Sequence, residues 1–135
     1  MAITVTIIKN TFHEALVKVS GTPDDLTTNT ISAILTLTEL QLSNETLPKV
    51  NLAGWMVVGG NNGSGALERD GTRIITLTTI SGVVVDLRGD PFTPDEINND
   101  KDLEFFIFND HVEIYVHLKK VGHRLISDQT WNVPL

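Results

Sequence analysis

The stretch ALERDGTRIITLTTI, residues 66–80, is predicted to decide how the surrounding chain folds. Two runs of strand-forming residues flank the dipeptide Asp70-Gly71. A two-residue type I′ turn needs positive φ at both central positions, and Asp-Gly is one of the pairs that adopts it most readily. The stretch therefore predicts a tight β-hairpin with its turn at Asp70-Gly71.

Strand-like runs separated by turn residues continue on both sides of this hairpin, at a spacing of about ten residues that is typical of sandwiches and barrels. Residues 3–7 and 15–20 alternate apolar and polar side chains. The clearest alternation spans residues 112–119, which predicts an inward face for four residues of one strand: Val112, Ile114, Val116 and Leu118. We expect about eight to nine short strands in all.

Residues 24–40 are the one ambiguous segment. Pro23-Asp24-Asp25 could open a helix, but the segment is rich in Thr and Ile, which are β-branched and favour strands. We predict a strand or a pair of short strands here, and no helix. Exposed sheet edges need protection, either by a partner chain or by charged side chains, for which Lys18, Lys119 and Lys120 are candidates.

Composition narrows the class of protein. The chain has 135 residues, which is one domain by length, and it has no cysteine, which excludes disulfides and thiolate metal sites. Its net charge of −7 disfavours nucleic acid as a partner. No apolar run is long enough to span a membrane, and the first ten residues resemble a strand rather than a signal peptide.

No catalytic or cofactor motif is evident. His111 and His117 are six residues apart, which is not a recognised metal-ligand spacing, so we interpret them as a turn residue and an outward strand residue. The segment 90–104 carries enough carboxylates for calcium but lacks the glycine of a calcium loop, so a solvated loop is the simpler interpretation. The candidate ligands are Asp95, Glu96, Asp100, Asp102 and Glu104. Ser64 does not fit a nucleophile elbow, and Trp55 is expected in the core.

Several short segments, taken in order, form a recognisable string: ALVKVSGT (15–22), VNLAGW (50–55), GALERDGTRIITL (65–77), VDLRGDP (85–91), NDKDLEFFI (99–107) and IYVHLKKVGH (114–123). This string resembles a group of small virion structural proteins of tailed bacteriophages, of the type that infects marine and cyanobacterial hosts. Two positions depart from that group: Met56, where serine is frequent, and His123, where the last motif ends in tyrosine.

The resemblance implies a non-enzymatic virion component without a cofactor. A capsid decoration or cement protein is the first expectation, made in the host cytoplasm and bound to the capsid exterior, with the major capsid protein and copies of itself as partners. A compact, acidic protein suits this role because its charge keeps it soluble until it docks. A head–tail connector, neck or tail accessory protein is the alternative, and a carbohydrate-binding β-sandwich is the further alternative.

The expected architecture is a single antiparallel β-sandwich, jelly-roll-like, over residues 1–124, followed by a C-terminal tail at residues 125–135. The tail lacks strand alternation but carries the apolar residues Trp131, Val133 and Leu135. Such a segment either closes the core of its own chain or orders against a partner through an aromatic anchor. We predict the second, an interface in which Trp131 is the main anchor.

Overall fold

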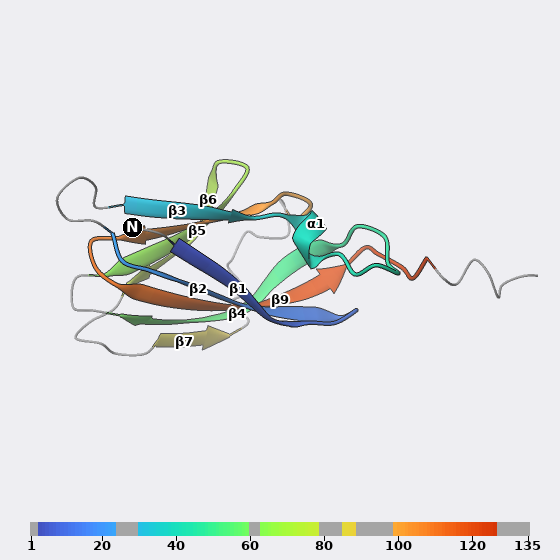
Figure 1. Ribbon diagram of the computed structural model, residues 1–135, viewed down its shortest axis with the longest axis horizontal. Coiled ribbons are helices and arrows are strands. Elements are labelled where there is room, and N and C mark those ends of the chain that lie inside the picture. The colour runs from blue at the N-terminus through green and yellow to red at the C-terminus, as the bar shows by residue number, and fades with distance from the viewer. Residues whose placement is uncertain (1–2, 24–29, 60–62, 79–84, 89–98, 127–135) are drawn as a thin grey trace, which may run out of the picture.

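The computed structural model describes residues 3–23, 30–59, 63–78, 85–88 and 99–126. These residues form nine strands and one helical turn, arranged as two antiparallel sheets that face each other (Figure 1). In chain order the elements are β1 (Ile3–Asn10), β2 (Glu14–Gly21), β3 (Thr30–Leu35), α1 (Leu37–Leu40), β4 (Lys49–Gly59), β5 (Ser64–Arg69), β6 (Thr72–Thr78), β7 (Val85–Arg88), β8 (Leu103–Phe108) and β9 (Val112–Val121).

The strand order is that of a jelly roll. One sheet has the order β1-β2-β9-β4-β7 and the other β3-β8-β5-β6. Four antiparallel pairs, β5/β6, β4/β7, β3/β8 and β2/β9, are therefore nested around the β5–β6 hairpin, and successive pairs belong to alternate sheets. The predicted fold class, a single antiparallel β-sandwich of jelly-roll type, is confirmed.

The hairpin of β5 and β6, residues 64–78, is the centre of this nest. Asp70 has φ 51° and Gly71 has φ 79°, which are the positive values that the predicted tight turn requires. The turn thus fixes the innermost pair, and each outer pair brings together segments that lie further apart in the sequence.

The core lies between the two sheets, as the alternation of β9 predicts. Val112, Ile114, Val116 and Leu118 are each at most 1% exposed, and Trp55 is buried as expected. The other inward side chains come from both sheets and include Val17, Val19, Val57, Leu67, Leu103, Phe105 and Ile107. Full burial of such a side chain contributes about 1.5–3 kcal/mol, so these strands hold the sandwich together.

The segment after β3 departs from the prediction of strand alone. Leu37–Leu40 forms a single helical turn in which the Thr36 hydroxyl accepts from the Glu39 amide and the Glu39 carboxylate accepts from the Thr36 amide. This reciprocal cap satisfies the backbone amides of Thr36 and Glu39 at the start of the turn. Residues 24–29 of the ambiguous segment lie outside the described residues.

The expectation that Lys18, Lys119 and Lys120 protect sheet edges is wrong. β2 and β9 carry these lysines, and each of these strands has a neighbour on both sides. Among the described strands the edges are β1, β7, β3 and β6, and β1 packs beside β3 where the two sheets meet. Lys120 is buried instead of lying at the surface. No helix among the described residues is long and apolar enough to cross a membrane.

Candidate interaction site at the base of the C-terminal tail

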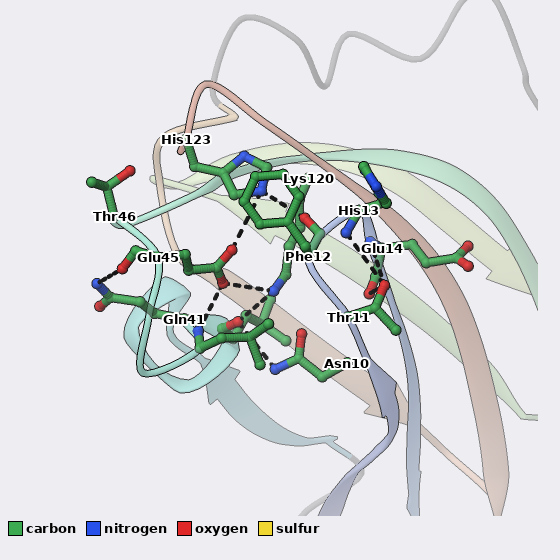
Figure 2. Close-up of polar contacts among 12 residues, drawn as sticks. Asn10, Thr11, Phe12, His13, Glu14, Gln41, Glu45, Thr46, Lys120 and His123 are labelled. Carbon is green, nitrogen blue, oxygen red and sulfur yellow. Dashed lines mark hydrogen bonds and ion pairs between the residues drawn. The ribbon is translucent and has the colours of Figure 1, made fainter. Parts of the chain in front are cut away.

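A cluster of buried polar side chains lies at the end of the sandwich where β9 finishes (Figure 2). Glu45 comes from the loop between α1 and β4. Lys120 lies near the end of β9, and His123 lies in the segment after β9. The side chains of Glu45 and Lys120 are fully buried, and that of His123 is 5% exposed. Charged groups are rarely buried unless they are paired, so this cluster needs a specific set of partners.

Lys120 occupies an inward position because it continues the alternation of β9 beyond Leu118. Its Nζ donates to the Leu40 carbonyl oxygen at 2.7 Å and to Glu45 Oε2 at 2.9 Å. These bonds compensate for the water that the ammonium loses on burial.

Glu45 is held by the loop that carries it. The Leu42 amide donates to Glu45 Oε2 at 2.7 Å, and the Gln41 side chain donates to the Glu45 carbonyl at 2.9 Å. The loop therefore wraps around its own carboxylate and aims it at Lys120, which fixes the position of residues 41–45 relative to β9.

His123 closes the cluster from the other side. Its Nε2 donates to the Phe12 carbonyl at 2.6 Å and lies 3.3 Å from Glu45 Oε1, while its ring packs on the Phe12 ring with 4.2 Å between centroids. Because the acceptor is a carbonyl, Nε2 carries the proton. His123 Nδ1 is buried without a hydrogen-bond partner among the described residues.

The backbone at the start of the tail is bonded to the same loop. Thr46 N donates to Arg124 O at 2.9 Å, Arg124 N donates to the Thr46 hydroxyl at 3.0 Å, and Ile126 N donates to Asn44 O at 2.7 Å. Leu125 forms a β-bridge with Glu45. The chain is therefore fixed up to Ile126, so the first two residues of the predicted tail pair with the domain.

Two large apolar side chains are exposed beside this point, Leu47 at 50% and Ile126 at 40%. Trp131, Val133 and Leu135, the predicted interface residues, lie outside the described residues. What the structure adds to that prediction is a rigid starting point for the segment that carries them.

A second candidate site is a hollow of about 230 Å³ on the outward face of the five-stranded sheet. A β-bulge between Leu52 and Gly54 places Gly54 opposite His117 on that face, where Gly54 has no side chain to fill the space. The hollow is mostly apolar and is lined by Leu16, Ala53, Gly54, Trp55, Met56, Tyr115 and His117.

Ionic contacts surround this hollow. His117 Nε2 lies 2.7 Å from Glu14 Oε1, and Lys9 donates to Glu14 Oε2 at 2.8 Å. The hydrogen bonds from Lys9 and then from His117 hold the pKa of Glu14 below its ordinary value. Tyr115 donates to Glu113 at 3.0 Å, which lowers the pKa of Glu113 and raises that of Tyr115. Both carboxylates therefore stay ionised at neutral pH.

The histidines and carboxylates that the sequence offers as metal ligands are not gathered into a metal site where the structure describes them. His111 lies at the β8–β9 turn, half-exposed, and His117 faces outward on β9, as predicted. Asp102 accepts from the Leu37 amide at 2.9 Å. Within the described ranges no group of three or more His, Asp or Glu side chains could hold a metal ion, and Asp95 and Glu96 lie outside those ranges.

Sequence reasoning missed the cluster of Glu45, Lys120 and His123. One signal was present, because Lys120 falls on the inward parity of β9. The partner carboxylate could not be found in the same way, since Glu45 lies in a loop without periodicity, 75 residues away from Lys120.

Comparisons with known proteins give little beyond fold similarity. No family model matches the chain, and no curated protein matches it in sequence. Similar solved structures include a cupin superfamily protein from Desulfitobacterium hafniense, with a TM-score of 0.36 and 6% identity over 90% of this chain and 79% of that chain.

Two others are a protein from Ralstonia eutropha with the provisional name mannose-6-phosphate isomerase and a cupin-like protein from Thermotoga maritima. The first has a TM-score of 0.35 and 6% identity over 90% of this chain and 86% of that chain. The second has a TM-score of 0.33 and 10% identity over 91% and 74%. At these TM-scores the likeness carries no argument about function.

Proposed function

We propose that this protein is a non-enzymatic structural component of a tailed-phage virion, and specifically a decoration protein that binds and stabilises the capsid shell from outside. The observation that carries the proposal is the hydrogen-bonded backbone at Ile126, followed in the sequence by Trp131, Val133 and Leu135. The resemblance of the strand motifs to small phage virion proteins supports it independently.

Rigid anchoring matters because a binding segment that leaves a fixed point loses less freedom on docking than one that leaves a mobile loop. The buried Glu45–Lys120–His123 cluster and the backbone bonds of Arg124 and Ile126 provide that fixed point. The apolar residues that follow can then insert into a pocket of a neighbouring subunit, with an aromatic side chain as anchor.

The net charge of −7 supports the same role. Like charges keep free copies apart and away from the packaged genome, while a local apolar contact still permits docking on the shell. A cluster of ionised groups suited to catalysis is not needed for this function.

The test is the stoichiometry and position of the protein in purified particles. We expect hundreds of copies per particle, in the symmetry of the shell, as quantified by mass spectrometry and seen by imaging of intact particles. A count of about a dozen would place the protein in a neck or tail ring instead, since such rings have low cyclic symmetry. Absence from particles would refute a virion role.

The hollow beside Tyr115 supports one other function, binding of a single sugar ring. An aromatic ring, an apolar floor and ionised carboxylates at the rim are the elements that saccharide recognition uses. An NMR titration of the full chain with a panel of monosaccharides tests this alternative, and shifts confined to Leu16, Met56 and Tyr115 would support it.

A further inference from the structure

Asn10 and Lys120 meet at one buried carbonyl oxygen. Asn10 Nδ2 donates to Leu40 O at 3.0 Å, and Lys120 Nζ donates to the same atom at 2.7 Å (Figure 2). The two nitrogens therefore lie within two hydrogen-bond lengths of each other, with the Glu45 carboxylate 2.9 Å from Nζ. An amine, a carboxamide and a carboxylate are thus collected in one site, in which the Lys120 and Glu45 side chains are fully buried and Asn10 is partly buried.

The fold places Asn10 there through a local irregularity. The pairing of β1 with β2 shifts between Ile7 and Lys9, so Asn10 pairs with the inward-facing Ala15. Lys120 reaches the same end of the core from β9. β2 separates the two strands within the sheet, so neither residue is brought to the other by backbone pairing.

We propose that Lys120 Nζ and Asn10 Cγ form an isopeptide bond with release of ammonia. Lysine amines are nucleophiles once deprotonated, a carboxamide is an acyl donor, and a neighbouring carboxylate can carry the protons. This inference rests on the cluster itself and is independent of the proposed virion role.

The reaction balances without any other reagent. The Lys120 ammonium passes one proton to Glu45 Oε2 across their hydrogen bond, and the freed lone pair attacks Asn10 Cγ. The π electrons move to Asn10 Oδ1. Glu45 gives its proton to Asn10 Nδ2 and then takes a second proton from the attacking nitrogen. When the carbonyl re-forms, the Cγ–Nδ2 bond breaks and Nδ2 leaves as ammonia, which takes the second proton from Glu45 and becomes ammonium. Glu45 ends as the carboxylate that it was at the start.

Burial favours each step. Transfer of a proton from Lys120 to Glu45 removes two buried charges at once. Asn10 Oδ1 is buried and has no hydrogen-bond partner among the described residues, so it is not committed elsewhere when negative charge develops on it. Burial of the attacking Lys120 amine also keeps its lone pair from being solvated by water. The product would link β1 covalently to β9.

Intact mass spectrometry of the purified full chain tests the proposal. We expect a mass lower than that of the sequence by about 17 Da, one ammonia. Trypsin should then release a branched peptide in which residues 10–18 are joined to residues 120–124, because a linked Lys120 resists cleavage. The full sequence mass with two separate peptides would overturn the proposal.

A succinimide at Asn62-Gly63 would give the same mass loss, so the branched peptide decides between them. A mass loss without that peptide would also overturn the proposal. Because the unsubstituted chain answers the question, a variant that fails to fold does not weaken the test.

Substitutions then assign the roles. Asn10→Ala and Lys120→Met should restore the full mass expected for each variant, and Glu45→Gln should lose the bond because an amide cannot accept the proton. Lys119→Met is the matched control, since Lys119 is exposed on the same strand, and it should keep the mass loss. A branched peptide in Glu45→Gln would refute the role of Glu45 as proton carrier.

Discussion

The guanidinium group of the buried Arg69 donates a 2.6 Å hydrogen bond to the carbonyl oxygen of Val50, and this bond joins the two sheets. Arg69 ends β5 and Val50 lies in β4 of the opposite sheet. The same guanidinium donates to the carbonyls of Asn99 and Lys101 before β8. The Arg69 side chain thus connects the innermost hairpin to β4 and to the segment before β8.

Arg69→Met should therefore destabilise the fold strongly. The buried Val50 carbonyl loses its donor, which costs about 1–3 kcal/mol, and the part-buried carbonyls of Asn99 and Lys101 each lose one as well, so we expect the free energy of unfolding to fall by about 3 kcal/mol. Urea denaturation measures it. Arg73→Met, on the same hairpin, is the control, because Arg73 pairs with Glu68 at the surface and should cost about 0–1 kcal/mol. Equal losses in the two variants would contradict the role given to Arg69.

Arg69 and Lys120 also show where prediction from the sequence stops. The turn at Asp70-Gly71 and the inward face of β9 were predictable, because both follow from local backbone preferences and a period of two. Burial of the two cations was not, since it depends on carbonyl groups of Val50 and Leu40 that only the folded topology brings near them. Charged residues are normally expected outside.

Bulges limit sequence reasoning in the same way. The shift after Ile7 turns Asn10 inward, and the shift at Leu52/Gly54 opens the hollow beside His117. A one-residue irregularity reverses every facing that follows it, and it leaves little trace in the hydrophobic pattern of short strands. The fold class could be predicted, whereas the two candidate sites, both of which depend on bulges or loops, could not.

Gly65 packs against Ile114 across the core. A methyl group at Gly65 would lie 2.6 Å from Ile114 Cδ1, so Gly65→Ala should lower the free energy of unfolding by about 1–3 kcal/mol through overpacking. Ile114→Val removes that atom and alone should cost about 0.5–1.5 kcal/mol. The double variant should lose less than the sum of both, as measured by a denaturation cycle. Strict additivity would show that the two positions do not compete for space.

The Tyr115–Glu113 hydrogen bond predicts a pH effect. Tyr115 lowers the pKa of Glu113, so the stabilisation from this contact is present above the ordinary glutamate pKa and is lost as pH falls through the lowered value. Tyr115→Phe should shift the Glu113 titration upward in a carboxyl-carbon NMR experiment. Glu14, whose pKa depends on Lys9 and His117, is the internal control and should not move. An unchanged Glu113 titration would refute the assignment.

No divalent metal ion is expected to contribute to stability. Asp102, one of the described acidic residues of segment 90–104, accepts a backbone hydrogen bond from Leu37. Addition of EDTA should leave the melting temperature unchanged in a thermal denaturation scan, with magnesium- and calcium-supplemented samples for comparison. A fall of several degrees would instead reveal a bound ion, because an ion that binds only the folded state stabilises it in proportion to its occupancy.

Deletion of residues 127–135 separates the two roles open to the tail. The contacts that fix Arg124, Leu125 and Ile126 remain in the truncated chain, so its melting temperature should match that of the full chain. Incorporation into particles, or self-association measured by analytical ultracentrifugation, should be lost, because the deletion removes the apolar residues that are available to a partner. Trp131→Ala in the full chain should reproduce most of that loss, since an aromatic anchor carries a large share of interface energy. If the truncated chain instead unfolds at a lower temperature, the tail belongs to the core of its own domain, and the docking surface must be sought on the sheet faces.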